Sequence, residues 1–195
     1  MTGPSISRYD AVILAGGSAR RFGRPDKPGT LVGDRSMLDR VVDAVAGAQR
    51  VIVVGLRQPT RRPVTWLREQ PTGGGPVPAL ATGLTAVEAP VTVLLAADLP
   101  FLDAGLVTLL TDAVAAGHDG ALVVDADGRD QLLVGAWRTS ALRAALPPAP
   151  AGCRLSDILG RVSAVRVAAE ATPGSPVPWF DCDTPADLAA ARKWA

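Results

Sequence analysis

The sequence predicts an α/β fold built as one doubly wound, mostly parallel sheet. Apolar runs alternate with helical patterns along the chain, and the links between them are short. The runs at 51–54 and 91–95 show no alternation of polar and apolar residues, which is typical of strands covered on both faces. Strand-then-helix order with short links favours parallel pairing. A length of 195 residues suits one domain, which we expect to span 1–195.

The expected elements follow from apolar runs bounded by glycine, proline and charged residues. Ser36 can cap the first helix with Asp39 three residues on, Asp103 can cap the third, and Thr184 precedes Pro185 at a helix start. The expected strands lie at 10–14, 50–55, 64–67, 91–97, 120–124, 132–137, 162–167 and 179–182. The expected helices lie at 37–46, 76–88, 104–116, 138–145, 155–159 and 185–193.

Composition excludes several classes of function. The 20 lysines and arginines nearly balance 19 acidic residues, so no basic field predicts binding to nucleic acid or to an anionic membrane. No apolar run approaches the ~18 residues of a membrane span. A single histidine, His118, cannot build a histidine metal site. Cys153 and Cys182 lack Cys-x-x-Cys spacing, and we expect both to be free thiols in a cytoplasmic protein.

A glycine-rich segment after the first strand carries the clearest sign of chemistry. It reads Leu-Ala-Gly-Gly-Ser-Ala-Arg-Arg-Phe-Gly-Arg-Pro-Asp-Lys over residues 14–27. Gly16 and Gly17 let backbone N–H groups approach phosphate oxygens, and three arginines, Arg21 among them, supply positive charge. The spacing matches neither the P-loop nor the Rossmann dinucleotide pattern. The segment predicts a nucleoside triphosphate site, although an ordinary strand-to-helix turn can have this composition.

The lysine that ends this segment is a candidate phosphate ligand. Of the 20 basic residues other than histidine, only Lys27 and Lys193 are lysines. An ammonium on the loop could offset the charge that builds on a leaving pyrophosphate. The alternative is a solvent-facing lysine, which is the usual fate of this residue type.

Acidic residues follow two of the expected strands. Asp98 ends the apolar run at 93–97, where a carboxylate would lie over the edge of the sheet at which α/β folds bind ligands. Magnesium binds hard oxygen ligands, often one or two carboxylates plus substrate phosphates, and Asp98 fits that role. Asp183, in a small acidic cluster with Asp181 and Asp187, is a candidate second metal ligand. We expect Asp187 to complement the dipole of the last helix.

Two further loops have open interpretations. Gly73-Gly74-Gly75-Pro76 opens a helix and could contact a base or a sugar, or could be only a turn with proline at the helix start. Arg57, Arg61 and Arg62 could face a substrate or could form a solvated loop. Residues 125–130 are expected to form a hairpin turn rather than a calcium loop.

The sequence resembles the molybdenum cofactor guanylyltransferases, within the broader NTP-transferase-like group, over nearly its whole length. The family's signature, Leu-Ala-Gly-Gly … Arg-Met-Gly … Asp-Lys, is similar to this chain at residues 14–17, Arg21, Gly23 and 26–27. Further similarity lies in Gly75-Pro76, in Asp98-Leu99-Pro100-Phe101-Leu102 and in Asp183-Thr184-Pro185-Ala186-Asp187-Leu188. The chain departs from the family pattern at Phe22, 77–79, 131–133, Asp181 and Asp183.

The resemblance implies a Rossmann-like nucleotidyltransferase fold and a role for each matching residue. Leu14, Ala15, Gly16 and Gly17 would line the guanine nucleotide. Gly75 would lie near the same nucleotide, Lys27 would bind phosphate with Arg21 beside it, and Asp98 would hold Mg²⁺. The family also has an acidic residue before its Gly-Pro pair, and Glu69 is the candidate for it here, with Gln70 as the alternative.

The implied reaction is transfer of GMP from GTP to the terminal phosphate of molybdopterin, which yields the guanine dinucleotide cofactor and pyrophosphate. Other cofactor-biosynthesis proteins are expected partners. One alternative is the same chemistry with another pair, such as CTP or a sugar or alditol phosphate acceptor. The other alternative is a nucleotide-binding module of the same fold that does not turn over.

Overall fold

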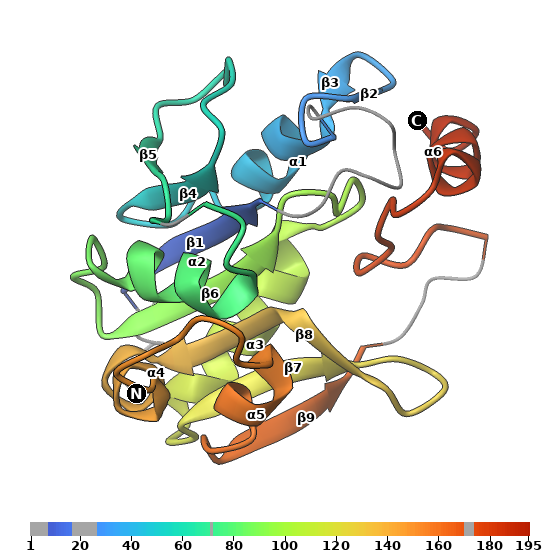
Figure 1. Ribbon diagram of the computed structural model, residues 1–195. Helices are drawn as coiled ribbons and strands as arrows, with labels where there is room; N and C mark the ends of the chain where they lie inside the picture. The colour runs from blue at the N-terminus through green and yellow to red at the C-terminus, as the bar shows by residue number, and fades with distance from the viewer. Residues whose placement is uncertain (1–7, 17–26, 71, 170–173) are drawn as a thin grey trace.

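The molecule is built around a seven-stranded sheet of order β5-β4-β1-β6-β8-β7-β9 (Figure 1). The structure is a computed structural model, which describes residues 8–16, 27–70, 72–169 and 174–195. The strands of the sheet are β1 (Tyr9–Ala15), β4 (Val51–Gly55), β5 (Thr65–Leu67), β6 (Val91–Ala96), β7 (Gly120–Val124), β8 (Asp130–Arg138) and β9 (Ala164–Ala168).

The sheet is mostly parallel, as the sequence predicts. β1 pairs in parallel with both β4 and β6, and β7 pairs in parallel with β9. β8 is antiparallel to both of its neighbours, β6 and β7. β7 and β8 are joined by the expected hairpin turn, in which Asp125 Oδ1 accepts hydrogen bonds from the N–H groups of Asp127 and Arg129.

Helices cover both faces of the sheet, which confirms the doubly wound α/β class. On β1, Ile13 packs on the side of α1 and α3, whereas Val12 and Leu14 pack on the side of α2. This alternation follows from the two-residue period of a strand and accounts for the continuous apolar run. The helices are α1 (Met37–Ala44), α2 (Pro76–Leu84), α3 (Ala104–Ala115), α4 (Thr139–Ala145), α5 (Leu155–Leu159) and α6 (Pro185–Arg192).

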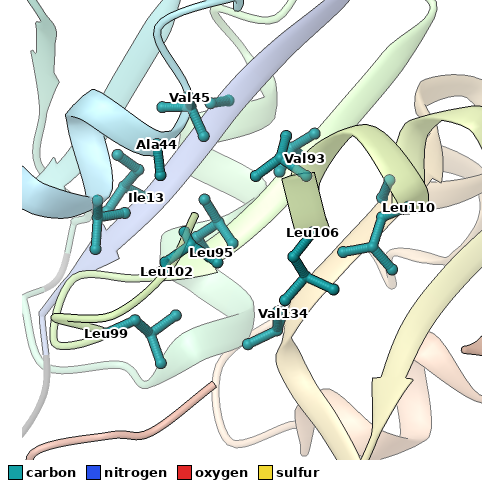
Figure 2. Close-up of a cluster of buried hydrophobic side chains, with 14 of the residues drawn as sticks. Ile13, Ala44, Val45, Val93, Leu95, Leu99, Leu102, Leu106, Leu110 and Val134 are labelled. Atoms are coloured by element: carbon teal, nitrogen blue, oxygen red, sulfur yellow. The ribbon is translucent and has the colours of Figure 1, made fainter. Parts of the chain in front are cut away.

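The core between the sheet and the α1–α3 layer fixes the segment that follows β6 (Figure 2). Leu99 and Leu102, just after Asp98, are 2% and 6% exposed and lie in the same cluster as Ile13 and Leu95. Burial of a leucine side chain stabilises a fold by about 1.5–3 kcal/mol. The two leucines therefore anchor the loop that carries Asp98.

The helix α2 packs directly against the sheet at Gly83. A Cβ atom on Gly83 would come within 2.5 Å of Val12 Cγ1 on β1 and 3.2 Å of Val54 Cγ2 on β4. Only glycine allows this approach without displacing a buried valine. The contact holds the C-terminal end of α2 directly against the middle of β1 and against β4.

The predicted helix starts are confirmed. Ser36 Oγ accepts from the N–H of Asp39 at 3.0 Å, and Asp103 Oδ1 accepts from the N–H of Leu106 at 2.9 Å. Thr184 and Asp187 form a reciprocal capping box at the start of α6. The capping box, rather than the helix dipole alone, explains the place of Asp187.

The expected strand at 179–182 is wrong. Trp179 and Cys182 are buried, but the segment runs as a loop, and its turn is closed by the Phe180 N–H donating to Val177 O. Phe180 and Cys182 pack beneath the last helix, and Trp179 packs into the core between the sheet and α1 and α3, so none of them pairs in the sheet. A short hairpin of β2 (Leu31–Val32) and β3 (Arg35–Ser36), which the sequence did not predict, lies beside α6 in Figure 1.

Candidate active site

The carboxyl ends of β1, β4 and β6 meet at one edge of the sheet. Ala15 is opposite Gly55, Leu14 is opposite Ala96, and the Ala97 N–H donates to Leu14 O at 3.1 Å. The start of the glycine-rich segment at Ala15 and Gly16 is therefore next to Asp98, as the topology of a parallel sheet requires. Gly17 and Arg21, the other predicted residues of this segment, lie outside the described residues.

Gly55, which sequence reasoning missed, allows the end of β4 to lie close to the end of β1. A Cβ atom at this position would lie 2.7 Å from the carbonyl oxygen of Ala15. A side chain here would push β4 away from the point at which β1 ends. The apolar run that ends in glycine was the available signal, because glycine at a strand end often marks close approach of two backbones.

Lys27 joins two carboxylates that are far apart in the sequence. Its Nζ lies 2.5 Å from Asp98 Oδ2 and 2.7 Å from Asp183 Oδ1. The Lys27 and Asp98 side chains are only 16% and 20% exposed, whereas that of Asp183 is 53% exposed. These three predicted residues thus come together at the carboxyl end of β6.

The ion pairs set the charge state of Lys27. Desolvation by partial burial lowers the pKa of its ammonium, but hydrogen bonds and charges from Asp183 and Asp98 outweigh this effect, so the pKa is raised above its ordinary value. Lys27 is therefore a fixed cation throughout the physiological pH range. It is not a general base.

The loop from Asp181 to Asp183 is held against β6 by its middle residue. The backbone N–H of Cys182 donates to Asp98 O at 3.1 Å, and the Cys182 side chain is fully buried with Val32, Met37 and Ala191. Desolvation, together with the charges of Asp98 and Asp187, raises the pKa of this thiol to about 12. Cys182 is an inert anchor, and sequence reasoning assigned it no such role.

Asp181 adds a third carboxyl group to this end of the sheet. Partial desolvation and the negative charges of Asp183 and Asp98 raise its pKa. Within the described parts of the chain, no group of three or more histidine, cysteine, aspartate or glutamate side chains has the geometry of a complete metal cage. A site that holds Mg²⁺ here would use few protein ligands.

The residues fit such an ion. Asp98 Oδ2 and Asp183 Oδ1 already converge on one cationic atom, the Nζ of Lys27. Magnesium is commonly held by one or two carboxylates, with substrate phosphates and water completing its shell. Asp98 and Asp183 therefore supply the donor chemistry that a divalent ion with a bound triphosphate requires.

Glu69 lies in the loop before α2 and has one free oxygen. Its Oε1 accepts from the Gly73 N–H at 2.7 Å, while its Oε2 is buried and has no hydrogen-bond partner among the described residues. Gly75 precedes the helix with a φ of 97°, a conformation that glycine adopts readily. Gln70, the alternative candidate, is exposed, whereas Glu69 is partly buried.

Two of the three arginines of the second group are bonded to α1. The Arg61 N–H donates to Asp39 Oδ1 at 2.8 Å, and Arg62 Nε donates to Asp43 Oδ1 at 2.7 Å, so both residues fasten the loop after β4 to α1. Arg57 lines a cavity of about 730 Å³ with them, Trp66 and the neighbouring loop residues. This cavity lies on the α1 side of the sheet, because Trp66 packs against that core.

Comparison with known proteins identifies the family. The profile of the MobA-like NTP transferase domain matches residues 11–165. The chain belongs to this family. A protein of Bradyrhizobium sp. (strain ORS 278) named molybdenum cofactor guanylyltransferase is 29% identical over 206 aligned residues, which cover 100% of this chain and 97% of that protein.

Solved structures share the fold of this MobA-like chain. Molybdopterin-guanine dinucleotide biosynthesis protein A from Archaeoglobus fulgidus superposes with a TM-score of 0.70 at 19% identity, over 94% of this chain and 97% of that one. 2-C-methyl-D-erythritol 4-phosphate cytidylyltransferase from Thermus thermophilus superposes with a TM-score of 0.66 at 21% identity, over 94% of this chain and 97% of that one. Rv0371C of Mycobacterium tuberculosis H37Rv, in complex with manganese, superposes with a TM-score of 0.71 at 16% identity, over 97% of this chain and 100% of that one.

The described helices include none that is both long enough and apolar enough to cross a bilayer.

The two thiols of this MobA-like chain should differ in reactivity. In the folded protein at pH 8, Cys153, which is partly exposed, should react with a disulfide reagent such as DTNB. Cys182 should react only on unfolding, because its thiol is buried and its pKa is about 12. Spectrophotometric titration should therefore show one reactive thiol in buffer and a second in denaturant. The variant Cys153→Ser should show none in buffer, and rapid labelling of that variant would contradict the buried anchor.

Proposed function

We propose that this protein is a magnesium-dependent molybdenum cofactor guanylyltransferase, acting as a single MobA-like NTP transferase domain over residues 1–195. It would transfer GMP from GTP to the terminal phosphate of molybdopterin and release pyrophosphate. The observation that carries the proposal is the meeting of Lys27, Asp98 and Asp183 at the strand ends beside Ala15 and Gly16. In this proposal, Lys27 is the phosphate-binding cation and Asp98 and Asp183 are the metal-binding carboxylates beside the start of the glycine-rich segment.

The chemistry of this reaction requires the protein mainly to position the reacting phosphates and to offset their negative charge. An oxygen of the acceptor phosphate attacks the α-phosphorus of GTP, and the bond from that phosphorus to the bridging oxygen of pyrophosphate breaks. The acceptor is already ionised, so no general base is required. Catalysis then depends on holding both phosphates in line and on offsetting negative charge.

Each described residue of the site has a part in this scheme. The backbone at Leu14, Ala15 and Gly16, with Gly17 beyond the described segment, would contact the nucleotide. Lys27 would offset charge on the departing pyrophosphate, and Arg21 is proposed to assist it. Asp98 and Asp183 would hold Mg²⁺, which when bound neutralises charge on the phosphate oxygens.

Glu69 supports guanine as the base. A carboxylate only accepts hydrogen bonds, and Oε2, which has no partner but is buried in this structure, could accept from the ring N–H and amino group of guanine once the loop before α2 exposed it to the nucleotide. Cytosine presents two acceptors and a single amino group at the equivalent edge, so an ionised carboxylate matches it less well. The fold is shared with a cytidylyltransferase, so the fold alone does not select the base, and the proposed preference for guanine depends on Glu69.

The remaining parts of the proposal concern partners and location. The substrates would be GTP and the molybdopterin cofactor, and other proteins of cofactor biosynthesis would deliver the acceptor. A cytoplasmic location is proposed because both cysteines are free thiols, as is usual in a reducing compartment.

The variant Asp98→Asn tests the metal role. Loss of one anionic ligand should lower the rate of pyrophosphate release, with GTP, Mg²⁺ and molybdopterin present, by at least about a hundredfold, as is common when a charge-stabilising group is removed. The matched control is Asp103→Asn, because asparagine caps a helix about as well as aspartate. Equal release by Asp98→Asn and wild type would remove Asp98 from the mechanism. Absence of release from the wild type would favour the binding-module alternative.

The variant Glu69→Gln tests the base. The glutamine side chain can still accept the bond from the Gly73 N–H through its amide oxygen, and its NH₂ group replaces the second carboxylate oxygen. The affinity for GTP should therefore fall about tenfold, which corresponds to roughly 1.4 kcal/mol. The shift in Tm on adding GTP measures this, because a ligand bound only by the folded state raises Tm. Gln70→Ala is the control and should keep the wild-type shift. Protection of the wild type by CTP and not by GTP would overturn the guanylyl assignment in favour of the cytidylyl alternative.

A further inference from the structure

The ammonium of Lys27 lies where a divalent ion held by both Asp98 and Asp183 would lie. Its Nζ is 2.5 Å from one carboxylate oxygen and 2.7 Å from the other. Magnesium binds oxygen ligands at about 2.1 Å, so an ion in contact with both of these oxygens would need nearly the same space. The carboxylate pair can therefore hold the ammonium or the ion, but not both in this arrangement.

The local charges also favour one cation at a time. The carboxylate of Asp181 interacts with those of Asp98 and Asp183 and with the ammonium, so three carboxylates share one described positive group. The Lys27 and Asp98 side chains are mostly buried, and solvent screens their charges less than charges at the surface. An ion that arrived while Lys27 stayed would meet a like charge, whereas departure of Lys27 would leave the carboxylates to the ion.

We infer that Lys27 competes with the divalent ion for the Asp98–Asp183 pair. Without nucleotide, the Lys27 ammonium occupies the pair. When a nucleotide binds, its phosphates attract the ammonium away, and the carboxylates become available to the ion. The part played by the nucleotide rests on the proposed function. The competition itself rests only on the three side chains. Because coupling between two ligands is reciprocal, the nucleotide would strengthen binding of the ion, and the ion would strengthen binding of the nucleotide.

Mn²⁺ binding to the full chain without nucleotide tests the competition directly. Free Mn²⁺ is measured by its paramagnetic resonance signal in a titration of protein. Lys27→Met removes the charge and keeps an apolar stem, and it should bind Mn²⁺ at least about tenfold more tightly than the wild type, a factor in the usual range of coupling between sites. Lys27→Arg keeps a cation and should show no such gain. Lys193→Met removes the other lysine and should bind Mn²⁺ as the wild type does.

Equal or weaker Mn²⁺ binding by Lys27→Met, with the fold intact by circular dichroism, would overturn the inference. If that variant does not fold, Lys27→Gln takes its place, because its amide can still donate to a carboxylate, and the same gain is required. A gain in Mn²⁺ affinity without pyrophosphate release by the wild type would leave the competition standing and refute the proposed function. Normal release without the gain would refute the competition alone.

Discussion

The parallel pairing of β1 with β6 is the constraint on which the candidate site depends. It places the carboxyl ends of two buried strands side by side, so that the glycine-rich segment leaves the sheet next to Asp98. The apolar faces of both strands are buried under helices on two sides, and a slip of the pairing by one residue would exchange those faces. The position of Asp98 relative to Ala15 is therefore fixed by the whole core and not by local contacts alone.

The C-terminal segment completes the site by a different route. The Cys182 N–H bonds to the carbonyl of Asp98, and the buried thiol fixes the segment beneath α6. Asp183 then reaches Lys27, which is 156 positions earlier in the chain. One end of the chain supplies the cation, the middle supplies a carboxylate, and the other end supplies a second carboxylate. This arrangement accounts for a site built from short, separate signals rather than from one motif.

Much of this could be predicted from the sequence, for physical reasons that differ between residues. The runs that form β1, β4 and β6 are apolar on both faces, so their class and their parallel pairing follow from burial. Asp98 could be placed because a parallel sheet puts strand ends at one edge. Lys27 was suggested by its scarcity. The caps at Ser36, Asp103 and Thr184 follow from local hydrogen bonding, which a few residues determine.

The failures have equally physical causes. The apolar residues of 179–182 fill space in two clusters, Trp179 in the main core and Phe180 and Cys182 under α6, and a short apolar run does not distinguish that role from a buried strand. The roles of Gly55 and Cys182 depend on contacts with distant backbone, at Ala15 and Asp98, that no local pattern encodes. The surroundings of Glu69, which are the bond from the Gly73 N–H and the burial of its second oxygen, likewise depend on how the loop folds.

The most direct test of the central claim is a crystal structure of the protein with GTP and Mn²⁺, with data collected at the manganese absorption edge. We expect an anomalous peak in contact with Asp98 and Asp183, with the triphosphate against the backbone that follows β1 and within reach of the Lys27 ammonium. A peak distant from both carboxylates, or a nucleotide bound in the cavity beside Arg57 and Trp66, would contradict the claim.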